Sequence, residues 1–62
     1  MNSKIVYVLA RPDGTYKSTA DMDGWSRDIT QADRYDSFQS AETSAVIYKA
    51  HVVRVRIVFE IL

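Results

Sequence analysis

The last eleven residues of the chain, VVRVRIVFEIL, alternate between two sets of side chains. A period of two is typical of a β-strand, because successive side chains of a strand point to opposite faces of its sheet. The pattern predicts one long strand over residues 52–62 and places its more apolar set on the core: Val53, Val55, Ile57, Phe59 and Ile61. Arg54, Arg56 and Glu60 in the other set exclude a membrane span.

The chain has 62 residues and no cysteine, which predicts a single domain over residues 1–62 with a small core and no disulfide. We therefore expect a second copy or a bound partner to add stability. The apolar run 5–10 is short and contains Tyr7, so it predicts a strand rather than a secretory signal. These features favour a cytoplasmic location, with no membrane as a partner.

Residues 4–10 are rich in β-branched and aromatic side chains and predict a first strand. The tetrapeptide RPDG then predicts a tight turn, with Pro12 and Asp13 at its centre and Gly14 in a left-handed conformation. Residues 15–19 predict a short return strand at the edge of the sheet.

A helix is predicted over residues 40–50, with Ser40 as the N-cap and with Lys49 and His51 at the C-terminal end, where they favour the helix dipole. Its expected apolar face contains Ala41, Ala45 and Tyr48, widened by Val46 and Ile47. The elements together predict an α+β fold of order β-β-α-β. A three-stranded antiparallel sheet would have its first strand in the centre and one main helix packed on one face.

The segment 20–36 predicts a structured connection, in which Thr30 caps a helical turn over residues 31–34. Trp25 has two interpretations: a side chain that closes the gap between helix and sheet, or an exposed anchor for a partner. Tyr35 and Phe38 are expected in the core. The first strand is apolar on both faces, so one sheet face remains open for association unless residues 20–36 cover it.

The residue types and their spacing give little indication of a catalytic site or a metal site. Asp21, Asp23 and Gly24 resemble part of a calcium loop, but Thr19 and Thr30 occupy the positions that require carboxylates. His51 is the only histidine, and no serine lies in a nucleophile-elbow pattern. We expect no enzyme, no cofactor and no metal. Eight basic residues balance eight acidic ones, which argues against a broad nucleic-acid footprint.

The segments YVLARPDGTYKST, WSRDITQADRYDSFQSAETSA and HVVRVRIV resemble a plan common among small uncharacterised phage and prophage proteins. In that plan a hairpin leads to a Trp-containing segment, an Ala-bearing turn, an aromatic residue and a Ser/Thr-capped helix before a final strand. The chain is also similar in plan to the small phage inhibitor of host RNA polymerase. The resemblance rests on Trp25, Ala32, Phe38, Ser40 and Ala45, and it assigns no functional residue.

Three functions follow as hypotheses. The first is a non-enzymatic phage-type protein that binds a host or phage protein in the bacterial cytoplasm and inhibits or modulates it. The second is nucleic-acid binding through stacking aromatics and arginines on the open sheet face. The third is a homodimer that buries this face in both copies. Arg54 and Arg56 also have a simpler interpretation as solvated charges. The candidate binding residues are Tyr7, Tyr16, Trp25, Arg54, Arg56 and Val58.

Overall fold

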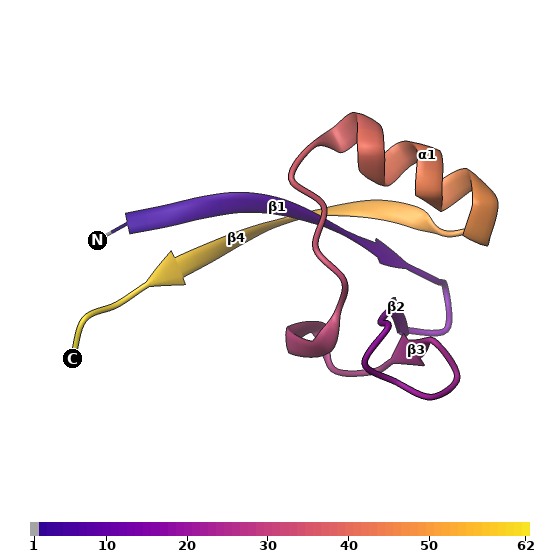
Figure 1. The fold of residues 1–62 in the computed structure, drawn as a ribbon, viewed down its shortest axis with the longest axis horizontal. Coiled ribbons are helices and arrows are strands. Elements are labelled where there is room, and N and C mark those ends of the chain that lie inside the picture. The colour runs from indigo at the N-terminus through magenta and orange to yellow at the C-terminus, as the bar shows by residue number, and fades with distance from the viewer. Residues whose placement is uncertain (1) are drawn as a thin grey trace.

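Two nine-residue strands, β1 (Asn2–Ala10) and β4 (His51–Phe59), form the long antiparallel ribbon of the fold (Figure 1). The computed structural model describes residues 2–62. The pairing runs without interruption from Asn2 opposite Phe59 to Ala10 opposite His51. The predicted α+β class and the antiparallel pairing of the first and last strands are therefore confirmed. The end of the ribbon that holds both chain ends projects beyond the rest of the molecule.

The sheet has four strands rather than the three predicted from the sequence, in the order β3-β2-β1-β4. The turn after β1 forms as predicted, with the Gly14 amide donating to the Arg11 carbonyl at 3.1 Å and Gly14 at φ 85°. The return strand β2 (Tyr16–Lys17) is short, but it is not at an edge, because β3 (Trp25–Ser26) pairs with its far side. Gly24, at φ 82°, turns the chain back into β3.

The helix α1 (Phe38–Tyr48) begins three residues earlier than its predicted N-cap implies. Ser37 is the N-cap, and its side chain accepts a hydrogen bond from the Ser40 amide at 3.1 Å, so the prediction for Ser40 is wrong. The helix ends at Lys49, which adopts the left-handed conformation at φ 54°. His51 does not cap the helix, because it is the first residue of β4 and pairs with Ala10.

The helix packs on the face of the sheet opposite to the one predicted. Its small residues Ala41 and Ala45 are buried against Leu9, with Tyr7 and Val52 packed around them. Alanine side chains allow the helix axis to approach the sheet closely. The prediction that Val46 and Ile47 widen the buried face of the helix is wrong. Val46 and Ile47 are 77% and 70% exposed, and Phe38 is half exposed rather than in the core.

The second face of the sheet is covered by the segment between β3 and α1, as the alternative interpretation of residues 20–36 required. This segment contains a short 3-10 helix, η1 (Ile29–Gln31), capped by the Asp28 side chain rather than by Thr30. It lies against Val6 and Val8, which are each only 2% exposed. Both faces of β1 are therefore buried at the centre of the molecule, and the expected open face is closed there.

Backbone and hydroxyl hydrogen bonds fix the covering segment in place. The Ser18 hydroxyl, buried beneath it, donates to the Gln31 carbonyl at 2.6 Å. The Asp33 amide donates to the Lys17 carbonyl at 2.8 Å. Tyr35 then exchanges two backbone hydrogen bonds with Tyr7, of 2.9 and 2.8 Å, on the edge of β1 that faces away from β4. The chain thus crosses from one face of the sheet to the other beside β1.

The two serines at the start of α1 give a direct test of this local structure. We expect Ser37→Ala to lower the free energy of unfolding by about 1 kcal/mol, because one amide of the first turn loses its acceptor. Ser40→Ala should change it by less than about 0.5 kcal/mol, since the Ser40 amide remains bonded. Urea denaturation of both variants measures the difference, and a larger loss for Ser40→Ala would contradict the observed cap.

Candidate protein-binding site

The β4 strand has an open edge along its whole length, because it is the last strand in the sheet order. Tyr7 directs its amide and carbonyl away from β4, toward Tyr35. Its partner in the register, Arg54, must then direct its own amide and carbonyl away from β1, since such pairs alternate along an antiparallel ladder. The same alternation turns the backbone groups of Val52, Arg56 and Val58 outward.

These outward backbone groups have no hydrogen-bond partner within residues 2–62. We call the outward amides and carbonyls of Val52, Arg54, Arg56 and Val58 the β4 edge. An unpaired strand edge of this length is a template for another strand, unless charges, prolines or bulges block it. The β4 sequence has no proline or glycine, and its two arginines are the charged groups beside the edge.

Arg54 and Arg56 lie on the same sheet face as α1, and both side chains are exposed. Over residues 2–62 the ion pairs are Lys4 with Asp36 at 3.2 Å and Arg11 with Asp13 at 3.5 Å. Neither pair includes Arg54 or Arg56. Two positive charges beside the β4 edge therefore lack an intramolecular carboxylate, which favours a partner that supplies one.

The projecting end of the ribbon exposes a group of apolar side chains. Val58 and Phe59 are 50% and 54% exposed, and Ile61, which follows β4, is fully exposed. A shallow pocket lined by Asn2, Phe59, Glu60 and Ile61 lies at this end. Neither α1 nor η1 reaches it (Figure 1). Exposed apolar groups gathered next to an unpaired strand edge are typical of an association surface.

At the other end of β4, a groove separates the strand from α1. It is lined by Phe38, Glu42, Val46 and Lys49 of the helix and by His51 and Val52 of the strand. The exposed Val46 side chain forms part of this groove. A strand added to the β4 edge could therefore place an apolar side chain here.

The structure separates the two tyrosines that were predicted to share an open face. Tyr7 is half buried beneath α1, where its ring meets the Phe38 ring edge to face with the centroids 5.8 Å apart. Tyr16 pairs with Ala10 and Ser26, and so it lies on the other face of the sheet. The predicted stacking platform of Tyr7, Tyr16 and the two arginines is therefore wrong in its geometry.

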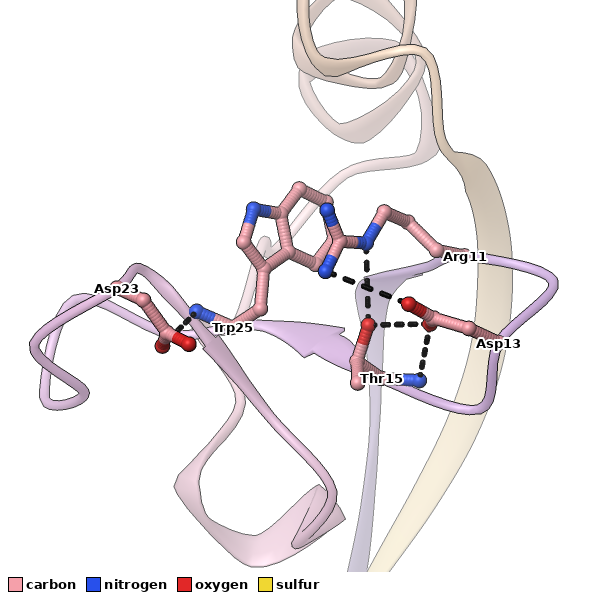
Figure 2. A network of polar contacts seen from close by, with 5 residues as sticks. All are labelled: Arg11, Asp13, Thr15, Asp23 and Trp25. Carbon is pink, nitrogen blue, oxygen red and sulfur yellow. Dashed lines mark hydrogen bonds and ion pairs between the residues drawn. The ribbon is translucent and has the colours of Figure 1, made fainter.

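Trp25 lies far along the sheet from the β4 edge, on the face of α1. It pairs with Lys17 in the register, and its ring contacts the Tyr48 ring at the end of the helix, with the centroids 6.4 Å apart. The Arg11 guanidinium stacks over the indole at 3.8 Å (Figure 2). This placement agrees with the interpretation of Trp25 as a side chain that closes the gap between helix and sheet, although the residue remains half exposed.

The turn beside Trp25 is held by a network around Asp13. The Arg11 guanidinium donates to the Thr15 hydroxyl at 3.1 Å, and Thr15 donates to the Asp13 carboxylate from both its hydroxyl and its amide (Figure 2). Hydrogen bonds from the Thr15 hydroxyl and amide lower the pKa of the Asp13 carboxyl below 3.8. The same arrangement of hydroxyl and amide in Thr30 lowers the pKa of Asp28. Both carboxylates are structural groups in turns.

No cluster of three metal-ligating side chains occurs among residues 2–62. No helix in this part of the chain has the length and the apolar character needed to cross a membrane. The candidate surface consists of backbone groups, arginines and apolar side chains, a composition suited to recognition of another polypeptide.

The predicted sheet, with its first strand in the centre, already placed the last strand at an edge, and the candidate residues Arg54, Arg56 and Val58 lie beside that edge. The sequence analysis did not name the backbone of this edge as a binding surface, and it did not predict the exposure of Phe59 and Ile61. The signal was present in the lengths of the two predicted strands. The first strand offers residues 4–10 as partners, whereas the alternating pattern of the last strand continues to Leu62. A tail that extends past its only long partner strand must expose apolar side chains.

The fold and this surface define a small α+β protein with one long unpaired strand edge. Comparison with models of known protein families, with curated protein sequences and with solved structures found no match.

The Asp13 network predicts a pH dependence of stability. A carboxyl whose pKa is lowered by folding stabilises the native state above pH 3.8, and this contribution is lost as the pH falls through the lowered value. Asp13→Asn should therefore be less stable than the wild type at neutral pH, with the difference narrowing at about pH 2. Thr15→Val removes the hydroxyl donor, so it should also be less stable than the wild type at neutral pH, with a smaller difference at about pH 2.

Thermal unfolding of the wild type, Asp13→Asn and Thr15→Val at neutral pH and at about pH 2 measures these stability differences. A difference between Asp13→Asn and the wild type that stays constant with pH would contradict the role of the ionised carboxylate.

Proposed function

We propose that the chain is a non-enzymatic protein-binding module that recognises an extended segment of its partner by strand addition to the β4 edge. The single observation behind this proposal is the row of outward backbone groups on a nine-residue edge strand, with exposed apolar side chains at its end. Strand addition is a recurring mode of peptide recognition, in which main-chain hydrogen bonds provide affinity and alternate side chains provide specificity.

The side chains beside the edge restrict what the added strand can contain. On the α1 face it would meet Arg54 and Arg56, which favour a carboxylate in the partner. On the η1 face it would meet Val53, Val55 and Ile57, which favour apolar side chains. The expected partner segment therefore alternates apolar residues with polar ones, of which at least one is acidic.

The resemblance to small phage proteins leads us to propose that the module acts in the bacterial cytoplasm on a host or phage protein. Occupation of the β4 edge by a segment of that protein would inhibit or modulate its activity, since the segment would be withdrawn from its own fold or assembly. The proposal assigns no chemical step to this chain.

A proline at position 58 separates strand addition from other binding modes. Val58 lies opposite Ser3 in a pair whose backbone groups face outward, so Val58→Pro removes an edge donor while the β1–β4 hydrogen bonds remain. Val58→Thr keeps this amide and nearly the same shape. Tagged wild type, Val58→Pro and Val58→Thr are used to capture proteins from a bacterial lysate that also contains untagged chain.

We expect a bound protein to be retained by the wild type and by Val58→Thr and to be lost with Val58→Pro. Circular dichroism of the three proteins checks that each is folded. Equal capture by both variants, or no capture by folded wild type, would overturn the proposal.

A further inference from the structure

We infer that the strand added to the β4 edge is the same strand of a second copy, antiparallel to the first about a two-fold axis at Val58. This inference rests on the strand-addition function proposed above and assigns the β4 edge to a second copy of the chain, with which a segment of a host or phage protein would compete. Residues 54–62 have the composition that the β4 edge requires, because apolar side chains at the odd positions alternate with a set that contains Glu60. The chain thus supplies the carboxylate that Arg54 and Arg56 lack.

Charge excludes most two-fold registers. The two strands can form backbone hydrogen bonds only through the outward groups at even positions. The two-fold axis therefore lies between a residue and the same residue of the other copy, and we name the axis by that residue. An axis at Arg54, Val55 or Arg56 sets an arginine directly opposite an arginine, and directly opposed like charges destabilise a strand pair. An axis nearer the start of β4 would lead the second strand into the turn at Lys49.

Two registers bring Glu60 opposite an arginine. An axis at Ile57 pairs Glu60 with Arg54 of the other copy, but it makes the two Arg56 side chains diagonal neighbours, about 7–8 Å apart. Glu60 follows the end of β4, so each of these pairings extends the strand beyond Phe59. An axis at Val58 then pairs Glu60 with Arg56 of the other copy and leaves Arg54 diagonal to the same carboxylate. No arginine then has an arginine beside it across the interface, which makes Val58 the favoured centre.

The same register covers the exposed apolar end of the ribbon. On the η1 face, Ile57 lies opposite Phe59 of the other copy. Val55 lies opposite Ile61, which is fully exposed in the single chain. On the α1 face the two Val58 side chains meet between the two Arg56–Glu60 pairs. The register with its axis at Val58 therefore gives the arginines a carboxylate partner and also brings the exposed apolar side chains into contact across the interface.

The fold leaves room for this pairing. The contacts of α1 with the sheet lie around Leu9 and Val52, at the opposite end of the ribbon from the axis. The free end projects away from α1 and from η1 (Figure 1). The two four-stranded sheets become one continuous sheet of eight strands, with β4 of each copy at its centre. The groove beside Val52 lies outside the overlap of residues 54–62 and stays open in each copy.

Single cysteines test the axis, because the natural chain has none. Facing residues of a hydrogen-bonded pair have Cα atoms about 5.5 Å apart, within the range that a disulfide spans. Val58→Cys should therefore give a covalent dimer under mild oxidation. Ile57→Cys is the matched control, since its counterpart is diagonal and beyond about 7 Å. A covalent dimer of Ile57→Cys in place of Val58→Cys would overturn the register.

Exchange of charges tests the pairing of Arg56 with Glu60. In sedimentation equilibrium we expect the wild type to dimerise and Glu60→Arg to dimerise about tenfold less tightly, since two symmetry-related ion pairs are replaced by repulsion. The double variant Arg56→Glu with Glu60→Arg should recover the wild-type dimer. Recovery by Arg54→Glu with Glu60→Arg instead would place the axis at Ile57 and overturn the inference.

Failure of this inference is distinguishable from failure of the proposed function. A wild type that stays monomeric at millimolar concentration overturns the inference. If Val58→Pro but not Val58→Thr then loses a host or phage protein, strand addition itself still stands. A dimer that Val58→Pro leaves intact overturns the inference, whereas the proposed function is overturned by equal capture with Val58→Pro and Val58→Thr.

Discussion

The pairing of β1 with β4 is the constraint on which the rest of the structure depends. It aligns nine residues of each strand and places Leu9 on one face and Val6 and Val8 on the other. A strand that is apolar on both faces can only be stable when both faces are covered. One helix cannot cover two faces, so the chain uses α1 on one side and the segment around η1 on the other. The crossing between them occurs at Tyr35, which bonds the free edge of β1.

This solution protects the central part of β1 and leaves β4 unprotected along one edge. The edge of β1 that faces away from β4 is closed by β2 at Ala10 and by Tyr35 at Tyr7. Its outward groups at Ser3 and Ile5, in the projecting end, have no partner among residues 2–62. The far edge of the sheet is the two-residue strand β3. β4 presents the long remaining edge, and the ribbon that it forms with β1 extends past both covering layers. A chain of 62 residues has too little sequence to cover both faces and both edges. The surface available for binding is therefore a direct consequence of how the core is built.

The limits of sequence prediction follow from particular residues. The RPDG turn was predictable because Pro12 and Gly14 restrict their own backbone whatever surrounds them. Ser37 and Ser40 are both good N-cap residues; in the structure the helix starts after Ser37, where Phe38 contacts Tyr7. The two-residue strand β3 has no periodicity to detect, since its pairing depends on the turn at Gly24. The prediction that His51 interacts with the helix dipole is wrong, because His51 is the first residue of β4 and pairs with Ala10.

The sequence by itself determined the α+β class, the antiparallel pairing of the first and last strands and the alternation that sends Arg54, Arg56 and Val58 to one face. These features depend on local periodicity, which is set by covalent geometry. The tertiary structure decided which face receives α1, where Trp25 lies and which edge stays open. The reason is that β1 is equally apolar on both faces, so the two phases look alike in the sequence. The choice between them comes from packing: Ala41 and Ala45 fit closely against Leu9, and residues 29–34 lie over the buried Val6 and Val8.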